Sequence, residues 1–217
     1  MFIFRLNKVV IRDNGTKKSG LGIFGHDFAD VSFLSIITVT NKDLLNLDAF
    51  IRAKSPAEQA KGLEPAVQSA IASRRIEGVS RVTDDAVLTF GDEGVALSEA
   101  EHIPESFNWT FAAIKSNAQL RDIGLSVDEV LNDSEFSEVT SGLAALLTSA
   151  AVTVNPACAV GMAIARITLK VAAKRMKAKV DRPLGMLSMS LNRFEHYFHG
   201  ERKRDGIADS TSNMWVD

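Results

Sequence analysis

The stretch Asp30–Thr40 reads DVSFLSIITVT and is rich in β-branched and aromatic residues. These residue types favour extended backbone because their side chains pack well on a pleated sheet surface. It carries the strongest strand signal in the chain. We therefore expect a central strand here, and we place the other elements by working outward from it.

Toward the N-terminus, Phe2 to Arg12 shows an imperfect alternation of apolar and polar residues and ends at the turn Asp13-Asn14-Gly15. This pattern predicts a strand followed by a turn. Charges at Arg5, Lys8 and Arg12 interrupt the apolar residues, so the segment lacks the apolar core of a signal peptide.

Toward the C-terminus, five further regions favour β structure. Ala86–Phe90 and Val95–Leu97 flank the turn Gly91–Gly94 and together suggest a hairpin. Phe107–Ile114 places Phe107, Trp109 and Phe111 on one face, where we expect a core. Leu184–Leu191 and Asn213–Val216 are predicted as the last strands.

Helical patterns separate these strands. Ala57–Ile76 and Asn117–Leu131 carry apolar residues at helix-compatible intervals, and alanine-rich sequence from about 135 to 179 is interrupted at Asn155-Pro156. These helices do not alternate one-for-one with strands. We therefore predict an α+β fold, a mostly antiparallel sheet or sandwich with a helical insertion at about 117–180, within a single domain 1–217.

The segment Val139–Ala165 contains no charged residue and is long enough to cross a bilayer. The central Asn155 and Pro156, with many small residues, favour instead a helical hairpin whose apolar faces pack on the sheet. The basic residues that follow recur at spacings of four, four and three, which places them on one side of a helix. They are Arg166, Lys170, Lys174 and Lys177, our predicted site for contact with a partner or a membrane. A solvated helix face is the alternative interpretation.

The charge balance argues against nucleic-acid binding. The 217 residues include 25 basic and 27 acidic side chains, a formal net charge of -2, so no excess of cations is available for phosphates. Cys158 is the only cysteine, which excludes an intrachain disulfide and a cysteine-based zinc cluster. This is consistent with a cytoplasmic location, with membrane association as the alternative.

Short motifs give no indication of an enzyme. Gly20–Gly25 spells G-x-G-x-x-G, but no predicted strand precedes it and no helix follows it. Glu195, His196, His199 and Glu201 lie close together without matching a metal-binding spacing. We therefore predict no catalytic residues, no metal and no cofactor.

The two ends of the chain resemble a C2-type β-sandwich, a family of phospholipid- and protein-binding domains. The resemblance covers about a third of the chain: the strand Arg5–Ile11 with its polar loop, the strand Val31–Val39, and the charged loop before Asn213–Val216. It implies a sandwich fold. The spacing of the candidate aspartates does not reproduce the calcium-binding pattern, so calcium is not implied; they are Asp13, Asp27, Asp30, Asp205 and Asp209.

Three hypotheses about function follow. The first is a non-enzymatic binding or scaffold protein that acts through a surface, with a protein, an anionic lipid surface or a second copy of the chain as its partner. The second is a membrane-active or lipid-binding protein that uses the apolar and basic segment 138–179. The third is an enzyme whose site is assembled from dispersed acidic residues and histidines, including His196, His199 and Asp205.

Overall fold

The fold is seen in a computed structural model, which describes ten stretches of the chain. They are residues 1–16, 28–39, 53–55, 58, 61, 73, 75–104, 106–115, 182–193 and 200–217. All that follows concerns these residues.

The elements in this part of the chain are ten strands. They are β1 (Phe2–Leu6), β2 (Lys8–Ile11), β3 (Ala29–Val39), β4 (Arg75–Val82), β5 (Ala86–Thr89), β6 (Val95–Ala100), β7 (Ser106–Lys115), β8 (Arg182–Asn192), β9 (Ile207–Ala208) and β10 (Met214–Val216). They form three antiparallel sheets: sheet A with β1 and β6, sheet B in the order β5-β2-β10-β9, and sheet C in the order β4-β3-β7-β8.

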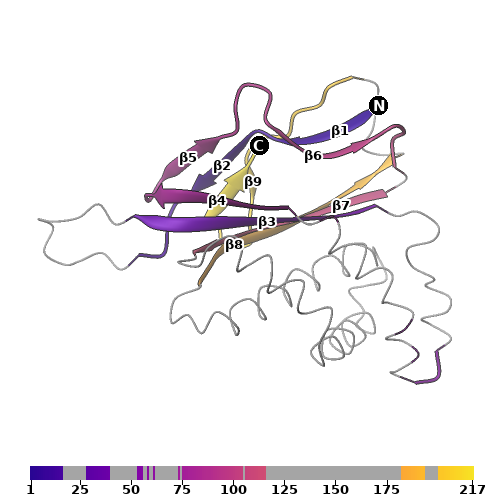
Figure 1. The fold of residues 1–217 in the computed structure, drawn as a ribbon, viewed down its shortest axis with the longest axis horizontal. Coiled ribbons are helices and arrows are strands. Elements are labelled where there is room, and N and C mark those ends of the chain that lie inside the picture. The colour runs from indigo at the N-terminus through magenta and orange to yellow at the C-terminus, as the bar shows by residue number, and fades with distance from the viewer. Residues whose placement is uncertain are drawn as a thin grey trace, which may run out of the picture.

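Sheets A and B lie above sheet C in Figure 1, so the described strands form a two-layered, sandwich-like arrangement. One apolar cluster between the layers draws residues from all three sheets, among them Leu6 of sheet A, Val9 of sheet B and Phe107 of sheet C. Burial of this cluster is the main driving force for holding the layers together.

Sheet C is built on β3 and β7, which pair along nine residues from Val31↔Lys115 to Val39↔Phe107. The predicted central strand and the predicted aromatic face are both confirmed, since β3 is an interior strand and Phe107, Trp109 and Phe111 are buried. The indole Nε1 of Trp109 donates a hydrogen bond to Ser35 Oγ at 2.9 Å, which satisfies the polar atom of a buried ring.

Apolar residues of β3 occupy both faces of the strand because both faces are buried. Phe33 and Ile37 point into the cluster between the sheets, whereas Leu34 and Ile36 lie on the opposite face and are each only 2% exposed. A strand buried on one face would alternate between apolar and polar residues. The two-sided burial therefore explains why this stretch has the strongest β signal.

The expected hairpin between Ala86–Phe90 and Val95–Leu97 is wrong, although both strands exist. β5 pairs with β2 and β6 pairs with β1, so the chain forms one long bent ribbon that is interrupted opposite Asn7. The Phe90 amide donates to the Asn7 carbonyl at 3.0 Å at this bend. The turn residues Gly91–Gly94 indicate where β5 ends and β6 begins, but they do not indicate which strands β5 and β6 pair with.

The prediction of an α+β fold is also wrong, because the described residues are nearly all β: the ten elements are strands, and only Glu58, Lys61 and Arg193 are helical. The expected insertion at about 117–180 lies outside the described residues. The end of the predicted helix Ala57–Ile76 falls in β4, where Ser35↔Arg75 and Leu34↔Ile76 are strand pairs. Pairing with the long strand β3 outweighs the local helical periodicity here.

Two glycines at the bend of the ribbon provide a matched test. Gly91 and Gly94 both have a positive φ, but a Cβ at Gly94 would lie 2.7 Å from the Leu6 carbonyl oxygen and one at Gly91 would meet nothing within 4 Å. We expect Gly91→Ala to cost about 1 kcal/mol through backbone strain, and Gly94→Ala to cost at least about 1 kcal/mol more through the clash. Urea denaturation measures both, and equal losses would contradict the bend geometry.

Candidate functional site

The outer face of sheet B carries an apolar row across its four strands. Alternation along each strand turns Val9, Ile11, Met214 and Val216 into the core, where all four are buried. The intervening residues then point outward, and the register aligns Ala208, Trp215, Val10 and Val87 across the sheet. Val87 is 59% exposed and the Trp215 side chain is half-buried.

Arg12 covers the aromatic ring of this row. Its guanidinium carbon lies 4.5 Å from the centroid of the Trp215 ring, a distance typical of a cation–π contact. Arg12 is exposed, and within the described residues no carboxylate forms an ion pair with it. The contact therefore positions a cation and an aromatic ring on one surface and leaves the charge of Arg12 unneutralised.

Lys8 and Asp217 join β2 to the end of the chain. Their side chains form an ion pair, and the Asp217 amide donates to the Lys8 carbonyl at 3.0 Å. The hydrogen bond and charge of Asp217 raise the pKa of Lys8. The Oδ1 atom of Asp217 also accepts a hydrogen bond from the Gly206 amide at 2.6 Å. This bond anchors the charged stretch 201–205 beside sheet B.

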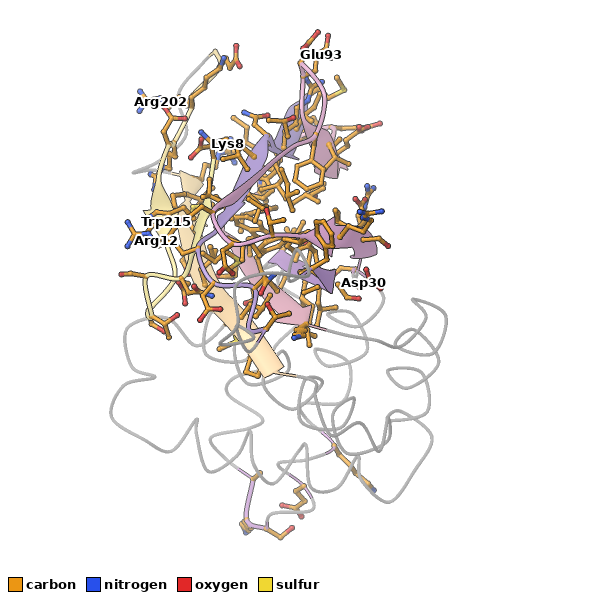
Figure 2. The ribbon with its side chains drawn as sticks, turned by 90° about the vertical axis from the view of Figure 1, so that its left-hand side faces the viewer. Lys8, Arg12, Asp30, Glu93, Arg202 and Trp215 are labelled. Carbon is orange, nitrogen blue, oxygen red and sulfur yellow. The ribbon has the colours of Figure 1, made fainter. Side chains whose placement is uncertain are left out.

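Figure 2 shows the resulting surface from the side. Arg202, Lys8, Trp215 and Arg12 lie along one side of the molecule, and Asp30 lies on the other. We refer to Lys8, Val10, Arg12, Val87 and Trp215, together with the adjoining stretch 201–205, as the sheet B surface.

A buried carboxylate shapes the turn that delivers β10 to this surface. The Asp209 residue is 4% exposed, and its two oxygens accept hydrogen bonds from the Thr211, Asn213 and Met214 amides and from the Thr211 hydroxyl. Burial alone would raise the pKa of Asp209, but these hydrogen bonds outweigh it and lower the pKa below its ordinary value of 3.8.

Strand β8 of sheet C contacts the same turn and the start of β10. The Asn213 Nδ2 donates to the Leu184 carbonyl at 2.7 Å and to the Asp13 carbonyl at 3.0 Å, so one side chain ties β8, the turn after β2 and β10 together. Gly185 of β8 lies beneath β10, where a Cβ would come within 2.8 Å of the Met214 Cβ. The absence of a side chain at Gly185 therefore allows the two layers to approach closely.

Two neighbouring residues of the sheet B surface are of types that are common at protein interfaces. Tryptophan and arginine are the residues most enriched among those that dominate binding energy at interfaces, and Trp215 and Arg12 stand side by side on a rigid sheet. The described residues include no group of three or more side chains that could hold a metal ion.

Most of the residues that the sequence singled out lie outside the part of the chain that the structure describes. Arg166, Lys170, Lys174 and Lys177 lie outside the described residues, as do Glu195, His196 and His199. Glu201 and Asp205, the described members of the dispersed enzyme hypothesis, are both exposed on the stretch before β9. Among the described residues, the structure contains no helix with the length and apolar character required to span a bilayer.

Sequence reasoning missed Arg12 and Trp215 as a site, because they come from opposite ends of the chain. The two strands that carry them were predicted separately, at Phe2–Arg12 and Asn213–Val216. A signal was present in the second strand, since Trp215 stands between the apolar residues Met214 and Val216. A single strand with one buried face would turn such an aromatic residue outward.

Comparison of the chain with models of protein families, with curated proteins and with solved structures found no match. The candidate site therefore rests on its own geometry.

The Asp209 turn makes the stability of β10 depend on pH. A lowered pKa means that Asp209 stabilises the fold at pH values above the ordinary carboxyl pKa, and that this contribution is lost as pH falls through the lower folded value. We expect Asp209→Asn to cost about 2 kcal/mol at neutral pH, because hydrogen bonds to a charged acceptor are lost.

As pH falls below the ordinary carboxyl pKa, the stability of this variant should fall less steeply than that of the wild type. Denaturation with urea at several pH values measures this slope. Asp205→Asn serves as the control because Asp205 is exposed and should change little. If Asp209→Asn keeps the wild-type dependence of stability on pH, then Asp209 is not the source of that dependence.

Proposed function

We propose that this protein is a non-enzymatic binding protein that engages a protein partner through the sheet B surface. The observation that carries the proposal is the half-buried Trp215 ring with the Arg12 guanidinium 4.5 Å from its centroid, since Arg12 forms no ion pair with a carboxylate of the described residues. Val10 and Val87 extend the ring into an apolar row that a partner side chain can cover.

The scaffold of this surface favours binding over catalysis. Its backbone is fixed by strand pairing on both sides of β2 and β10, and the cation–π contact restrains the two largest side chains. A surface that is already ordered loses little conformational entropy when a partner docks. A flat sheet face of this kind offers no enclosed site in which reacting groups could be held away from water.

The other hypotheses from the sequence receive less support. A membrane-active role for segment 138–179 stays a prediction, since that segment lies outside the described residues. The resemblance to C2 domains is supported only by the antiparallel, sandwich-like arrangement of the sheets. Asp209 does not favour a calcium site, because its oxygens already accept four hydrogen bonds within its own turn. A cytoplasmic location remains a proposal from the lone cysteine.

The test places a photo-crosslinking amino acid at position 87, which is 59% exposed in the apolar row, and irradiates the protein in an extract of its source cells. We expect a discrete adduct, whose partner is then identified by mass spectrometry. The variant Arg12→Ala should reduce adduct formation about tenfold or more, in line with the loss of an interface hot spot.

Arg5→Ala is the matched control, because Arg5 lies on the same ribbon and its exposed ion pair with Glu93 contributes little to stability. Circular dichroism should show that both variants remain folded. An adduct that forms equally well in Arg12→Ala, or no discrete adduct at all, would refute the sheet B surface as the binding site.

A further inference from the structure

The turn after β2 contains Asn14-Gly15, the only Asn-Gly pair in the sequence. We propose that this pair is a deamidation site that the native fold keeps closed, and that its reaction in the opened chain prevents the turn from forming again. The modification needs no partner and is independent of the proposed binding function.

Deamidation at such a pair is a substitution at the side-chain amide carbon. The Gly15 amide nitrogen gives up its proton and attacks Cγ of Asn14. The bond from Cγ to Nδ2 then breaks, and Nδ2 leaves with a proton as ammonia. Water opens the resulting cyclic imide at either carbonyl, which yields aspartate or an isoaspartate whose main chain runs through the side-chain carbon. Glycine favours the attack because no side chain shields its nitrogen, and asparagine is among the thermolabile residues.

The turn requires both members of this pair. Gly15 has a φ of 70°, a conformation that strains a residue with a Cβ. The Asn14 Oδ1 accepts hydrogen bonds from the Thr16 amide at 2.9 Å and from the Thr16 hydroxyl, an arrangement in which a short amide side chain mimics a backbone turn. The residues that build the turn are therefore the same residues that react when it opens.

In the folded chain, hydrogen bonds oppose each part of the reaction. Asn14 is 0% exposed, and its Nδ2, the leaving group, donates to the Val82 carbonyl at 2.8 Å. The Gly15 nitrogen donates its proton to Asp13 Oδ1 at 2.7 Å, and a carboxylate in this position disfavours the loss of that proton. The Asn14 amide donates to Asp84 Oδ1 at 2.9 Å. Ring closure must break several of these bonds, so we expect reaction only after the turn opens.

Lys115 also anchors the turn to sheet C. Its residue is only 9% exposed, and its Nζ donates to the Gly15 carbonyl at 3.2 Å. Together with the bond from Asn14 to Val82, this contact links the turn to β7 and β4. Opening the turn separates it from two strands of the other layer, which makes the opening one of the costlier local unfolding events.

The product cannot restore these contacts. An aspartate at position 14 would turn a carboxylate oxygen toward the Val82 carbonyl in place of the Nδ2 donor, in a fully buried position. It would also bring a second carboxylate beside Asp84, while Lys115 is engaged by the Gly15 carbonyl. An isoaspartate would lengthen the main chain just after β2. Deamidation is thus a one-way step that removes opened chains from those that can refold.

The first measurement is the rate of deamidation at Asn14 in the full chain. Peptide mapping and mass spectrometry follow it in mildly alkaline buffer, with and without urea. We expect the folded chain to react at least about a hundredfold more slowly than the unfolded chain, because the opened turn is rare. Equal rates in the two states would overturn the closed site.

Asp13→Ala tests the contact to the attacking nitrogen, and it leaves the backbone bonds of Asp13 to Asn213 in place. It should raise the rate in the folded chain about tenfold and leave the rate in urea unchanged, because the carboxylate is held at the nitrogen only in the folded turn. The matched control is Asp92→Ala, an exposed residue between β5 and β6 that should change neither rate.

Denaturation midpoints show whether Asp13→Ala acts on the turn or on global unfolding. An acceleration without a lower midpoint supports the role of Asp13. An equal acceleration in urea, or no acceleration in the folded chain, would overturn it.

The second measurement is the recovery of the fold after incubation in urea, followed by circular dichroism. In alkaline buffer the refolded fraction should fall with the same time course as deamidation at Asn14. In mildly acidic buffer the amide nitrogen keeps its proton, so the refolded fraction should be retained. Asn14→Asp reproduces one product directly and should have a lower denaturation midpoint than the wild type or fail to fold. If either the deamidated chain or Asn14→Asp regains wild-type stability, the proposed block to refolding is overturned.

Discussion

The backbone pairing of β2 with β10 is the interaction on which the rest of this structure depends. The amides of Asn7 and Lys8 both donate to the Asp217 carbonyl, and the amide of Arg12 donates to the Asn213 carbonyl. β10 thereby occupies an interior position in sheet B, between β2 and β9. Without it, β2 would lose one of its two neighbours and the core would lose Met214 and Val216.

The same pairing forms the surface that we propose as a binding site. Trp215 reaches the outer face of sheet B only because its neighbours Met214 and Val216 are buried on the inner face. Arg12 then finds the ring beside it because β2 is the adjacent strand. The strand pairing thus contributes both to stability and to the proposed site, so variants of the exposed side chains test the proposal better than variants of the core.

The hydrogen bonds of two polar side chains, Asp209 and Asn213, hold β10 in place. Asp209 satisfies the amides of the turn before it, and Asn213 bonds to carbonyls of two other segments. Buried polar groups are costly when they lose their partners. These side chains therefore specify the position of the strand, while the apolar contacts of Met214 and Val216 supply most of the favourable free energy.

The sequence predicted the strands well wherever residue type alone is decisive. β3 and β7 are rich in β-branched and aromatic residues, and both were located with their core residues. Partners were harder to predict. β5 and β6 are neighbours in the chain but pair with β2 and β1, because Gly94 and Asn7 mark a bend in a ribbon rather than the turn of a hairpin.

The candidate site could not be predicted for a related reason. A single sequence shows spacing along one element, which is how Arg166 to Lys177 were selected, but it does not show that Arg12 and Trp215 meet across two strands from opposite ends of the chain. The measurement that tests this most directly is nuclear Overhauser spectroscopy of the isotopically labelled protein. Cross-strand contacts between the backbones of Val10 and Trp215, with slow exchange of the Asp217 amide, are the predicted result. Rapid exchange of that amide with no such contacts would contradict the central claim.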